Sequence, residues 1–546
     1  MLQFNLKPSA ATIPSIDYTA KAIANKQIFW LRWMFALAIV AVIFSATMEV
    51  APILYGDEFM NIDLGRMILN PDSDWSICWM AYSGQPVFFY FYLGTVLQEI
   101  VFQIVGQYGP RILTLIGALV AATAIVRWLI ARGTSQNAAL ILGLVFLLDP
   151  LFVQAYTMGR LDSWTMALCI TSCWILRNTS YILNNQSHVK KRVMFAGALA
   201  SLAFFIWPSA VFLFPLILFE LISLSNKCEL NGNWKKTVSL ILLFGISALI
   251  IAILLLLPFA SHFYAKLYNV IEALKTNVRS GPTWGEQSGY LHFIAPFIEL
   301  LRALKYSPVL FLIALISAIW RREVGLVLAI MIASALMLST LVYMHRVQYL
   351  LPYLISFAAS FYQLGWKYKY AYKSFGYILR VGGLAGLLVW SISLSICIRS
   401  ILALDKRAER SRDLIYQAAQ SMIGPGKHSV LAPLEFYYTG RTLGWKMYKP
   451  YLAVGEPMTF KEWESILPLV NYVIVYQEGM TEEASQQLKE KGMRDGGSFY
   501  LYADPIEKGD TKPTNVKRIR NLYQIFRQPY GPYKLYVRET NHSIAN

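Results

Sequence analysis

The sequence predicts a helical protein that crosses a membrane many times and carries a soluble α/β domain at its C-terminal end. Of its 546 residues, 56% are hydrophobic and only 15% are charged, a balance that disfavours a water-soluble protein of this size. About eleven apolar stretches lie between residues 29 and 400, and several are short for a hydrocarbon layer of about 30 Å, so their ends are expected to extend into the flanking residues. Beyond residue 400 the composition changes to that of a soluble domain.

The first apolar stretch predicts a retained span and not a cleavable signal peptide. It begins only near Phe29, extends about 20 residues and lacks a small-residue cleavage site. Residues 1–28 are therefore expected to be a cytoplasmic N-terminal segment. The spans are expected near residues 29–48, 111–131, 138–156, 164–177, 193–207, 209–224, 237–258, 307–320, 324–343, 350–365 and 376–400.

The segment 86–105 decides the topology, because it is long enough to span but contains Gln98, Glu99 and Gln103. Inner loops of membrane proteins are enriched in Lys and Arg. If this segment lies along the outer interface, 19 of the 29 basic residues before residue 400 fall inside. We therefore expect an interfacial segment. The outer-face loops are then 49–110, 157–163, 259–306 and 344–349, and they hold Asp57, Glu58 and Asp162 together.

Residues 401–546 are expected outside the membrane, because eleven spans place the two ends on opposite sides. A helix is expected at 405–422, followed by a strand at 428–432. Another strand is expected at 471–476, a helix at 481–491 and a strand at 533–539, from their apolar periodicities. These elements predict a small extracytoplasmic α/β domain.

The charge and cysteine patterns argue against a nucleic-acid-binding protein and against a protein with a cysteine metal site or a disulfide framework. The net charge of +17 comes from cations that punctuate apolar stretches, which indicates membrane topology and not nucleic-acid binding. The cysteines lack the spacing of a metal site or a disulfide framework and are expected to be buried free thiols. They are Cys78, Cys169, Cys173, Cys228 and Cys397.

The pair Asp57-Glu58 follows the first span and opens a stretch with apolar residues at helical spacing. One interpretation is structural, with Asp57 as a helix N-cap and Glu58 favoured by the helix dipole. The other is a general base fixed at the membrane surface by a span and an amphipathic interfacial helix. The apolar face of that helix is predicted to carry Met60, Leu64, Met67 and Ile68.

A second outer loop places Arg160 and Asp162 next to each other at a span boundary. These residues either pair with each other and cap the next helix or belong to a site. Asp149 precedes Pro150 inside a span, where charge is costly, so we expect it to face the protein interior or water.

The arrangement of these residues resembles that of the GT-C glycosyltransferases. The features are Asp-Glu after the first span, Arg111 opening the second, and Asp162 after the third. Two further motifs are Gln85-Pro86-Val87-Phe88-Phe89-Tyr90 and Arg346-Val347-Gln348-Tyr349-Leu350-Leu351-Pro352. The branch is that of protein O-mannosyltransferases and lipid A aminoarabinose transferases. The resemblance covers residues 29–400 in architecture and about 50–170 in motifs, so residues 29–400 are expected to form a GT-C transmembrane catalytic domain.

Two features of this chain differ from the pattern of the family and narrow the subgroup that it resembles. Gln85-Pro86-Val87 stands where members often have Lys-Pro-Pro, so a phosphate-contacting lysine cannot be transferred to this chain. The loop 259–306 is also too short for the large inserted domain of the eukaryotic protein mannosyltransferases.

The resemblance implies an inverting glycosyltransferase that uses a sugar carried on polyprenyl (undecaprenyl) phosphate. Asp57 would accept the proton of an acceptor hydroxyl, and Glu58 or Asp162 would orient the acceptor or stabilise the developing positive charge. The acceptor is expected to be a hydroxyl or phosphate on a cell-envelope glycolipid, polysaccharide or protein. The setting is expected to be the bacterial inner membrane.

The departing phosphate needs cationic donors, and few are available in the outer loops. Arg279 and Arg346 are the preferred candidates, with Lys275 and His345 beside them; solvated loop charge and snorkelling to headgroups are the alternatives. Arg160, Gln85, Tyr82 and Trp284 are expected to contact substrate, although an interfacial belt also favours the aromatic residues. No metal-ligand cluster appears, but Asp57 and Asp162 could recruit Mg²⁺ or Mn²⁺.

Two other functions stay open at this point. A transporter or flippase for lipid-linked glycans would use Asp149 and Asp162 as cation or proton sites. A glycan ligase or polymerase would use the same donors without needing the Asp57-Glu58 pair.

Overall fold

A computed structural model describes most of the chain. The described residues are 16–48, 56–70, 92–179, 186–228, 234–261, 307–321, 323–338, 344–363, 373–405, 410–449, 451–453, 456–457, 466–477, 480–501 and 530–539. The chain divides into two compact units, Met1–Ser45 and Ala46–Asn546. The first contains nearly all of α1 (Ile16–Ala46). The expected boundary near residue 400 lies inside the second unit.

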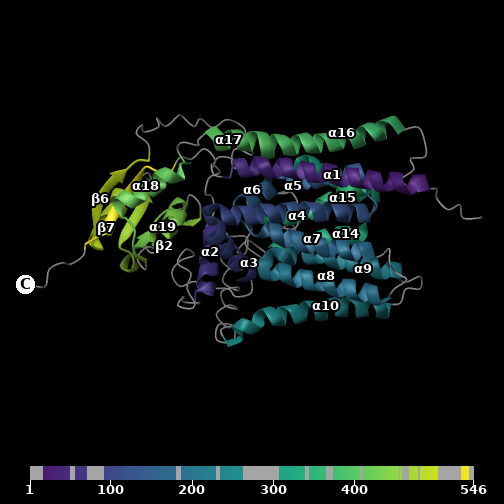
Figure 1. The fold of residues 1–546 in the computed structure, drawn as a ribbon, viewed down its shortest axis with the longest axis horizontal. Helices are drawn as coiled ribbons and strands as arrows, with labels where there is room; N and C mark the ends of the chain where they lie inside the picture. Colours follow the sequence, from purple (N-terminus) through teal and green to yellow (C-terminus); the bar gives the residue numbers. More distant parts are fainter. Residues whose placement is uncertain are drawn as a thin grey trace, which may run out of the picture. The chain divides into compact units, whose positions relative to one another are not determined.

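Long helices of the second unit form a bundle in which α4, α7, α8, α9 and α10 run side by side (Figure 1). Its helices are α4 (Gly109–Ala131), α5 (Gln136–Leu147), α6 (Pro150–Thr157), α7 (Asp162–Thr179), α8 (Gln186–Ile206), α9 (Phe214–Cys228), α10 (Trp234–Leu256), α13 (Pro308–Arg321), α14 (Val324–Leu338), α15 (Leu351–Ser360), α16 (Lys373–Ile392) and α17 (Arg399–Asp405). Of the expected thiols, Cys169 and Cys173 are confirmed as free and buried, whereas Cys397 is exposed.

Among the described residues, five helical stretches are long and apolar enough to cross a membrane, or six if the bent pair α5 and α6 forms one span. The chain is thus an integral membrane protein, while eleven spans remain a prediction. The expected span 138–156 is two helices bent by 57°. The bend occurs because Pro150 opens α6 and Asp149 caps it, with its side chain accepting a 3.0 Å hydrogen bond from the Leu151 backbone N–H.

Two shorter helices, α2 (Gly56–Leu69) and α3 (Tyr92–Val105), lie across the end of the bundle (Figure 1). The chain turns sharply between α3 and α4 at Gly106, whose φ of +77° is left-handed. Gly109 then packs so close to the Val101 carbonyl that a Cβ would lie 2.5 Å from its oxygen. α3 and α4 together form one apolar stretch, Tyr92–Ala131, that is long enough to cross a membrane, so the interfacial position of α3 stays a prediction.

The C-terminal part forms a five-stranded sheet in the order β2-β1-β5-β7-β6. Parallel pairing joins β1 to β2 and β5, and antiparallel pairing joins β7 to β5 and β6. The elements are α18 (Arg412–Met422), β1 (Ser429–Leu431), α19 (Tyr437–Leu443), β2 (Lys446–Tyr448), β5 (Tyr472–Tyr476), α21 (Glu482–Glu490), β6 (Met493–Phe499) and β7 (Tyr533–Arg538), with a separate hairpin of β3 (Tyr451–Ala453) and β4 (Glu456–Pro457).

Alternation along the strands separates the two faces of this sheet. Val430 and Ile474 belong to one buried cluster, whereas Leu431, Val473 and Val475 belong to another. The expected helix 405–422 corresponds to α18, which begins only at Arg412, and residues 406–409 lie outside the described residues. The helix begins there because Ser411 caps it by accepting from the backbone N–H of Leu414.

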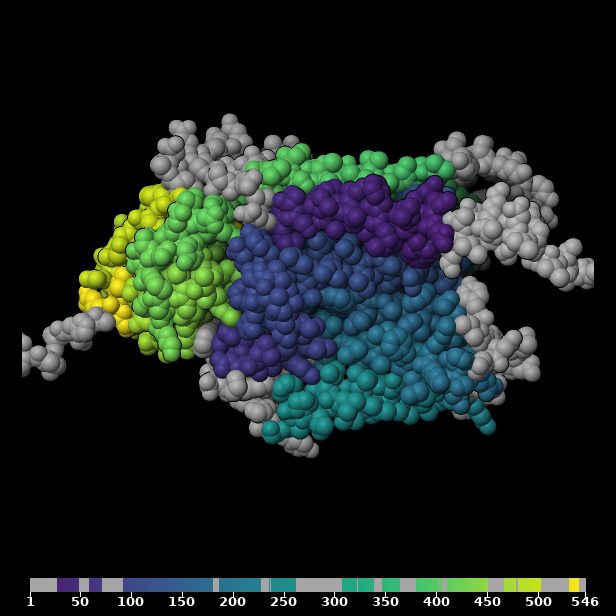
Figure 2. All heavy atoms as spheres, viewed as in Figure 1, coloured from purple at the N-terminus to yellow at the C-terminus, as the bar shows by residue number. Residues whose placement is uncertain are grey.

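Helix α2 packs into the first of these clusters, which we call the junction cluster. Its α2 members are Phe59, Ile62, Leu64 and Met67, and its other members come mainly from the C-terminal domain. Figure 2 shows that domain, in green and yellow, directly against the dark blue surface of α2 and α3.

The expectation of an amphipathic helix with an exposed polar face is therefore wrong for α2, while its interfacial position stays a prediction. Its polar residues Asn61 and Asp63 are buried as well. The apolar spacing within residues 56–69 predicts the apolar face of α2. It does not predict the domain that covers the helix, because the covering residues of that domain lie more than 300 positions later in the chain.

Candidate active site

An ion pair between Glu58 and Arg111 lies at the centre of the candidate site. Glu58 is 2% exposed and Arg111 is 0% exposed. Arg111 Nε and Nη2 donate to the Glu58 carboxylate at 3.3 to 3.4 Å, and Nη1 donates to the Met48 carbonyl at 3.0 Å. Arg111 opens α4 and Glu58 lies in the first turn of α2. The pair therefore fixes the start of α2 against the bundle.

The C-terminal domain supplies a third member of this group. Tyr438 of α19 donates its hydroxyl to Glu58 Oε1. Burial raises the pKa of Tyr438 well above its ordinary value, and the Glu58 charge raises that pKa further. Tyr438 is thus a neutral donor, and Glu58 shares its charge with two partners drawn from separate parts of the chain.

The loop before α7 packs directly onto Glu58. At Gly159, whose φ is +72°, a Cβ would lie 2.9 Å from Glu58 Cγ and 3.0 Å from Cδ. Gln98 of α3 donates to the Gly159 carbonyl, and Thr114 of α4 donates to the Tyr156 carbonyl at 2.7 Å. These contacts explain why glycine is needed here and why α3 carries a buried glutamine.

Asp162 is engaged on both of its oxygens. Arg160 Nε donates to Oδ2 at 2.9 Å, and the Tyr349 hydroxyl donates to Oδ1 at 2.7 Å. Asp162 is 1% exposed and begins α7. The self-paired Arg160 and Asp162 weighed from the sequence are therefore present, with Tyr349 as an additional partner.

Tyr349 and Arg346 lie in the 3₁₀ helix η5 (Met344–Leu350). Residues three apart eclipse each other in a 3₁₀ helix, so Arg346 lies on the same side of η5 as Tyr349. The Arg346 guanidinium carbon lies 5.9 Å from the centre of the Phe212 ring. This places one of the expected phosphate-binding cations on the element that holds Asp162.

Several expected site residues lie outside the described residues. Asp57 is in the first turn of α2, but its side chain is not among the described ones, and the same holds for His345 in η5. Gln85, Tyr82, Lys275, Arg279 and Trp284 also lie outside them. Among the residues that the structure does describe, no group of three His, Cys, Asp or Glu side chains could hold a metal ion.

Residues that the site prediction omitted come chiefly from the C-terminal domain. Arg441 of α19 pairs with the buried Glu99 at 2.8 Å, and Gln103 donates to the same carboxylate at 3.0 Å. This pair explains the buried Glu99, which meets the C-terminal domain, whereas Gln98 contacts the Gly159 carbonyl. The cluster of polar residues in 98–103 signals a buried partner, but nothing in the local sequence identifies Arg441.

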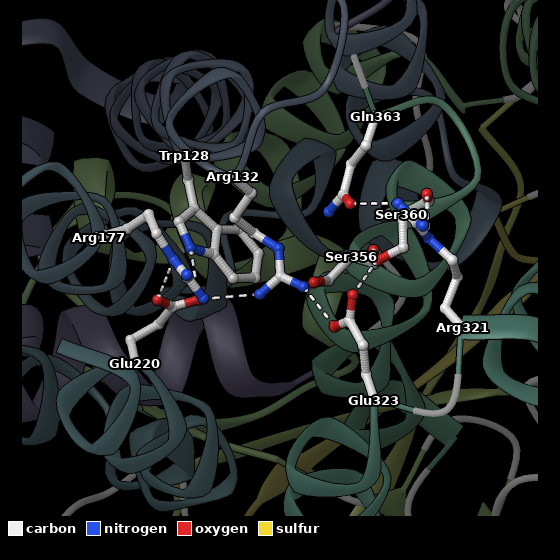
Figure 3. A network of polar contacts seen from close by, with 9 residues as sticks. All are labelled: Trp128, Arg132, Arg177, Glu220, Arg321, Glu323, Ser356, Ser360 and Gln363. Atoms are coloured by element: carbon white, nitrogen blue, oxygen red, sulfur yellow. Dashed lines mark hydrogen bonds and ion pairs between the residues drawn. The ribbon is translucent and has the colours of Figure 1, made fainter. Parts of the chain in front are cut away.

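A second ionic network lies at the opposite ends of α4 and α7. Glu220, 0% exposed, accepts from Arg132 at 3.0 Å and from Arg177 at 2.6 Å (Figure 3). Arg132 also reaches Glu323 at 2.6 Å. Each charge is paired with side chains from neighbouring helix ends, so this network fastens the bundle. It also contains Trp128, Arg321, Ser360 and Gln363.

Comparison with known proteins shows the fold. No protein-family model and no curated protein matches the chain. The chain is similar to ArnT from Cupriavidus metallidurans bound to undecaprenyl phosphate, with a TM-score of 0.55 and 12% identity over 86% of this chain and 96% of that one.

Two other solved structures are also similar. The apo state of ArnT gives a TM-score of 0.53, with 12% identity over 86% of this chain and 96% of that one. AglB from Archaeoglobus fulgidus, in complex with an inhibitory peptide and a dolichol-phosphate, has a TM-score of 0.48 at 12% identity over 82% and 69% of the two chains, which is too low to bear on the fold. The chain therefore has the fold of ArnT, in agreement with the fold expected from the sequence.

Proposed function

We propose that this GT-C chain is an inverting glycosyltransferase that moves a sugar from a polyprenyl phosphate to an acceptor at the outer face of the membrane. The fold is that of a protein solved with undecaprenyl phosphate bound. The donor we propose is a sugar on undecaprenyl phosphate or a related carrier. The acceptor is a hydroxyl or phosphate on an envelope glycolipid, polysaccharide or protein.

The observation that carries the proposal is the fixing of the first turn of α2 beside a buried cationic group. Glu58 is held by Arg111 and Tyr438. Asp57 is the preceding residue of the same turn, so its backbone position is set by these contacts. A general base needs a carboxylate held in place by surrounding residues, and the Glu58 contacts supply this support.

The proposed step transfers one glycosyl group and one proton. The Asp57 carboxylate takes the proton of the acceptor hydroxyl while that oxygen attacks the anomeric carbon. The bond from this carbon to the phosphate oxygen breaks on the opposite face, and the electron pair leaves with the polyprenyl phosphate. Because attack and departure occur on opposite faces, the anomeric configuration inverts.

Asp162 and Glu58 are assigned positioning roles. Both oxygens of Asp162 already accept from Arg160 and Tyr349, and Glu58 is shared by Arg111 and Tyr438. Arg160 thereby ties the loop 157–161 to the start of α7. We assign the base to Asp57 for this reason, with Arg346, Arg279, Lys275 and His345 as donors to the departing phosphate.

The proposed setting is the bacterial inner membrane, with residues 1–28 in the cytoplasm and the C-terminal domain outside. The transporter alternative gains no support from Asp149, which caps α6 and accepts from Ser307. It is also buried, at 2% exposed, in keeping with the expected interior position.

The test is a transfer assay with purified full-length protein in vesicles. A panel of polyprenyl-phosphate sugars and extracted envelope acceptors is supplied, and new glycoconjugates are measured by mass spectrometry. We expect one donor and one acceptor class to yield product. Movement of donor lipid between leaflets without any product, in the same vesicles, would contradict the proposal and establish the transporter.

A further inference from the structure

Arg412 is a buried cation that the proposed step has not used. It is the first residue of α18, and its guanidinium carbon lies 5.3 Å from the Tyr108 ring centre and 5.4 Å from that of Tyr438. The residue is half-buried as a whole, but its two terminal nitrogens are buried. Neither nitrogen has a hydrogen-bond partner among the residues that the structure describes.

The carboxylate that acts on the charge of Arg412 belongs to Glu58. Burial lowers the pKa of Arg412, and the Arg111 charge lowers it further, while Tyr438, Tyr530 and Glu58 oppose that shift. Glu58 already accepts from Arg111 and from the Tyr438 hydroxyl, so Arg412 has no carboxylate of its own among the described residues. The adjacent acid, Asp413, is exposed. A buried charge without a counter-ion is costly, so such a group attracts an anion.

We propose that Arg412 binds a phosphate group of the lipid-linked substrate, at the junction of α18 with α19 and the α3–α4 turn. Its two free Nη groups match the oxygens of a phosphate in a forked contact. The two tyrosine rings hold the guanidinium in place by cation–π contact. This inference rests on the proposed function, because that function supplies the lipid phosphate.

The position of Arg412 also gives the C-terminal domain a role in binding the substrate. Arg412 and Tyr438 both belong to it, whereas Arg111 and Glu58 belong to the bundle. The phosphate site is therefore complete only when the domain is docked on α2 and α3. The domain then contributes a direct ligand to the substrate.

The test measures thermal unfolding of the full-length protein in detergent with three additions: farnesyl phosphate, farnesol and inorganic phosphate. The variants are Arg412→Gln, Arg412→Lys and the control Arg494→Gln, which removes an exposed arginine of β6. We expect farnesyl phosphate to raise the Tm of wild type and of the control, whereas farnesol does not. The apparent affinity for farnesyl phosphate should fall about tenfold or more in Arg412→Gln.

The ligand-free Tm separates binding from a structural role. Because Arg412→Gln removes a buried guanidinium whose terminal nitrogens have no partner among the described residues, its ligand-free Tm should equal or exceed that of wild type. A lower Tm together with an unchanged response to farnesyl phosphate would overturn the proposal. Arg412→Lys, which keeps the charge but loses the fork, should bind with intermediate affinity, and this supports the site even if the glutamine variant does not fold.

The three additions distinguish a lipid phosphate from free phosphate. Together with the transfer assay they also separate failure of the Arg412 site from failure of the proposed function. A full shift with inorganic phosphate, lost in Arg412→Gln, supports the site with a free anion as its ligand. If farnesol raises Tm as much as farnesyl phosphate does, the phosphate is not recognised and the Arg412 site is overturned. If wild type binds farnesyl phosphate through Arg412 but transfers no sugar, the site stands and the proposed function fails. If Arg412→Gln binds and transfers as wild type does, only the site fails.

Discussion

At the scale of residues, adjacent Asp57 and Glu58 have different roles. Glu58 neutralises Arg111 and receives the Tyr438 hydroxyl, so its charge maintains the structure. Asp57 is assigned the proton transfer. A pair of neighbouring acids in sequence cannot show this division, because the partners of Glu58 lie 53 and 380 positions away.

Glu58→Gln should destabilise the protein. The change leaves Arg111 buried without a counter-charge, and breaking a buried ion pair costs about 3–5 kcal/mol. We expect the Tm of the full-length protein in detergent to fall by several degrees. Glu483→Gln, which removes an exposed acid from the first turn of α21, should leave Tm unchanged. A wild-type Tm for Glu58→Gln would show that Arg111 does not depend on this charge.

Gly159→Ala should be more damaging than Gly492→Ala. Both glycines have positive φ, +72° and +78°, but the Gly492 Cβ position meets nothing within 4 Å. The control therefore carries only the left-handed backbone cost of about 1–2 kcal/mol, whereas Gly159→Ala also displaces Glu58. The measurement compares their Tm values in detergent. Equal losses would show that the close approach to Glu58 has no energetic consequence.

At the scale of elements, the sequence predicts those with regular periodicity. β1, β5, α21 and β7 lie within one or two residues of expectation because apolar alternation or capping signals mark their ends. β6 was not predicted because its interior, Arg494-Asp495-Gly496-Gly497, has no apolar alternation; its pairing is set by β7. α19 was missed because its seven residues give too short a helical pattern.

The pair between Arg441 and Glu99 should hold the C-terminal domain against α3. Arg441→Gln leaves Glu99, which is 0% exposed, with Gln103 but without its cation. We expect hydrogen exchange in α19 and α2 to accelerate roughly 100-fold, as a loss of about 3 kcal/mol implies. Lys534→Gln breaks the exposed pair with Asp495 and should change the exchange rates less than fivefold. Equal effects would contradict the assignment of Arg441 as a clamp.

Glu435 should make the domain's stability depend on pH. Burial raises its pKa above the ordinary 4.5, although Tyr476 and Tyr533 donate to it. The folded state therefore binds a proton more tightly, so this contribution is full below pH 4.5 and is lost as pH rises through the folded pKa. Relative to wild type, Glu435→Gln should gain Tm as pH increases from 4.5 to 8. A pH-independent difference in Tm would contradict this.

At the scale of the whole molecule, the sequence predicts the fold class better than the site. The membrane-protein class follows from the apolar stretches, and the family resemblance rests on short motifs such as Asp57-Glu58 and Asp162; both are local signals. The contacts of Tyr438, Arg412 and Arg441 depend on docking of the C-terminal domain and leave no local signal. Likewise, Arg132 and Arg177 count as inner cations in the sequence but neutralise Glu220 in the structure.

The most direct test of the central claim is the rate of sugar transfer by Asp57→Asn beside wild type and Glu483→Gln. General base catalysis contributes about 10²- to 10⁴-fold, so we predict a fall of at least 100-fold for a hydroxyl acceptor, with inversion at the anomeric carbon in the wild-type product. Tm and farnesyl phosphate binding should stay as in wild type. A normal transfer rate by Asp57→Asn would contradict the assignment of Asp57 as the base.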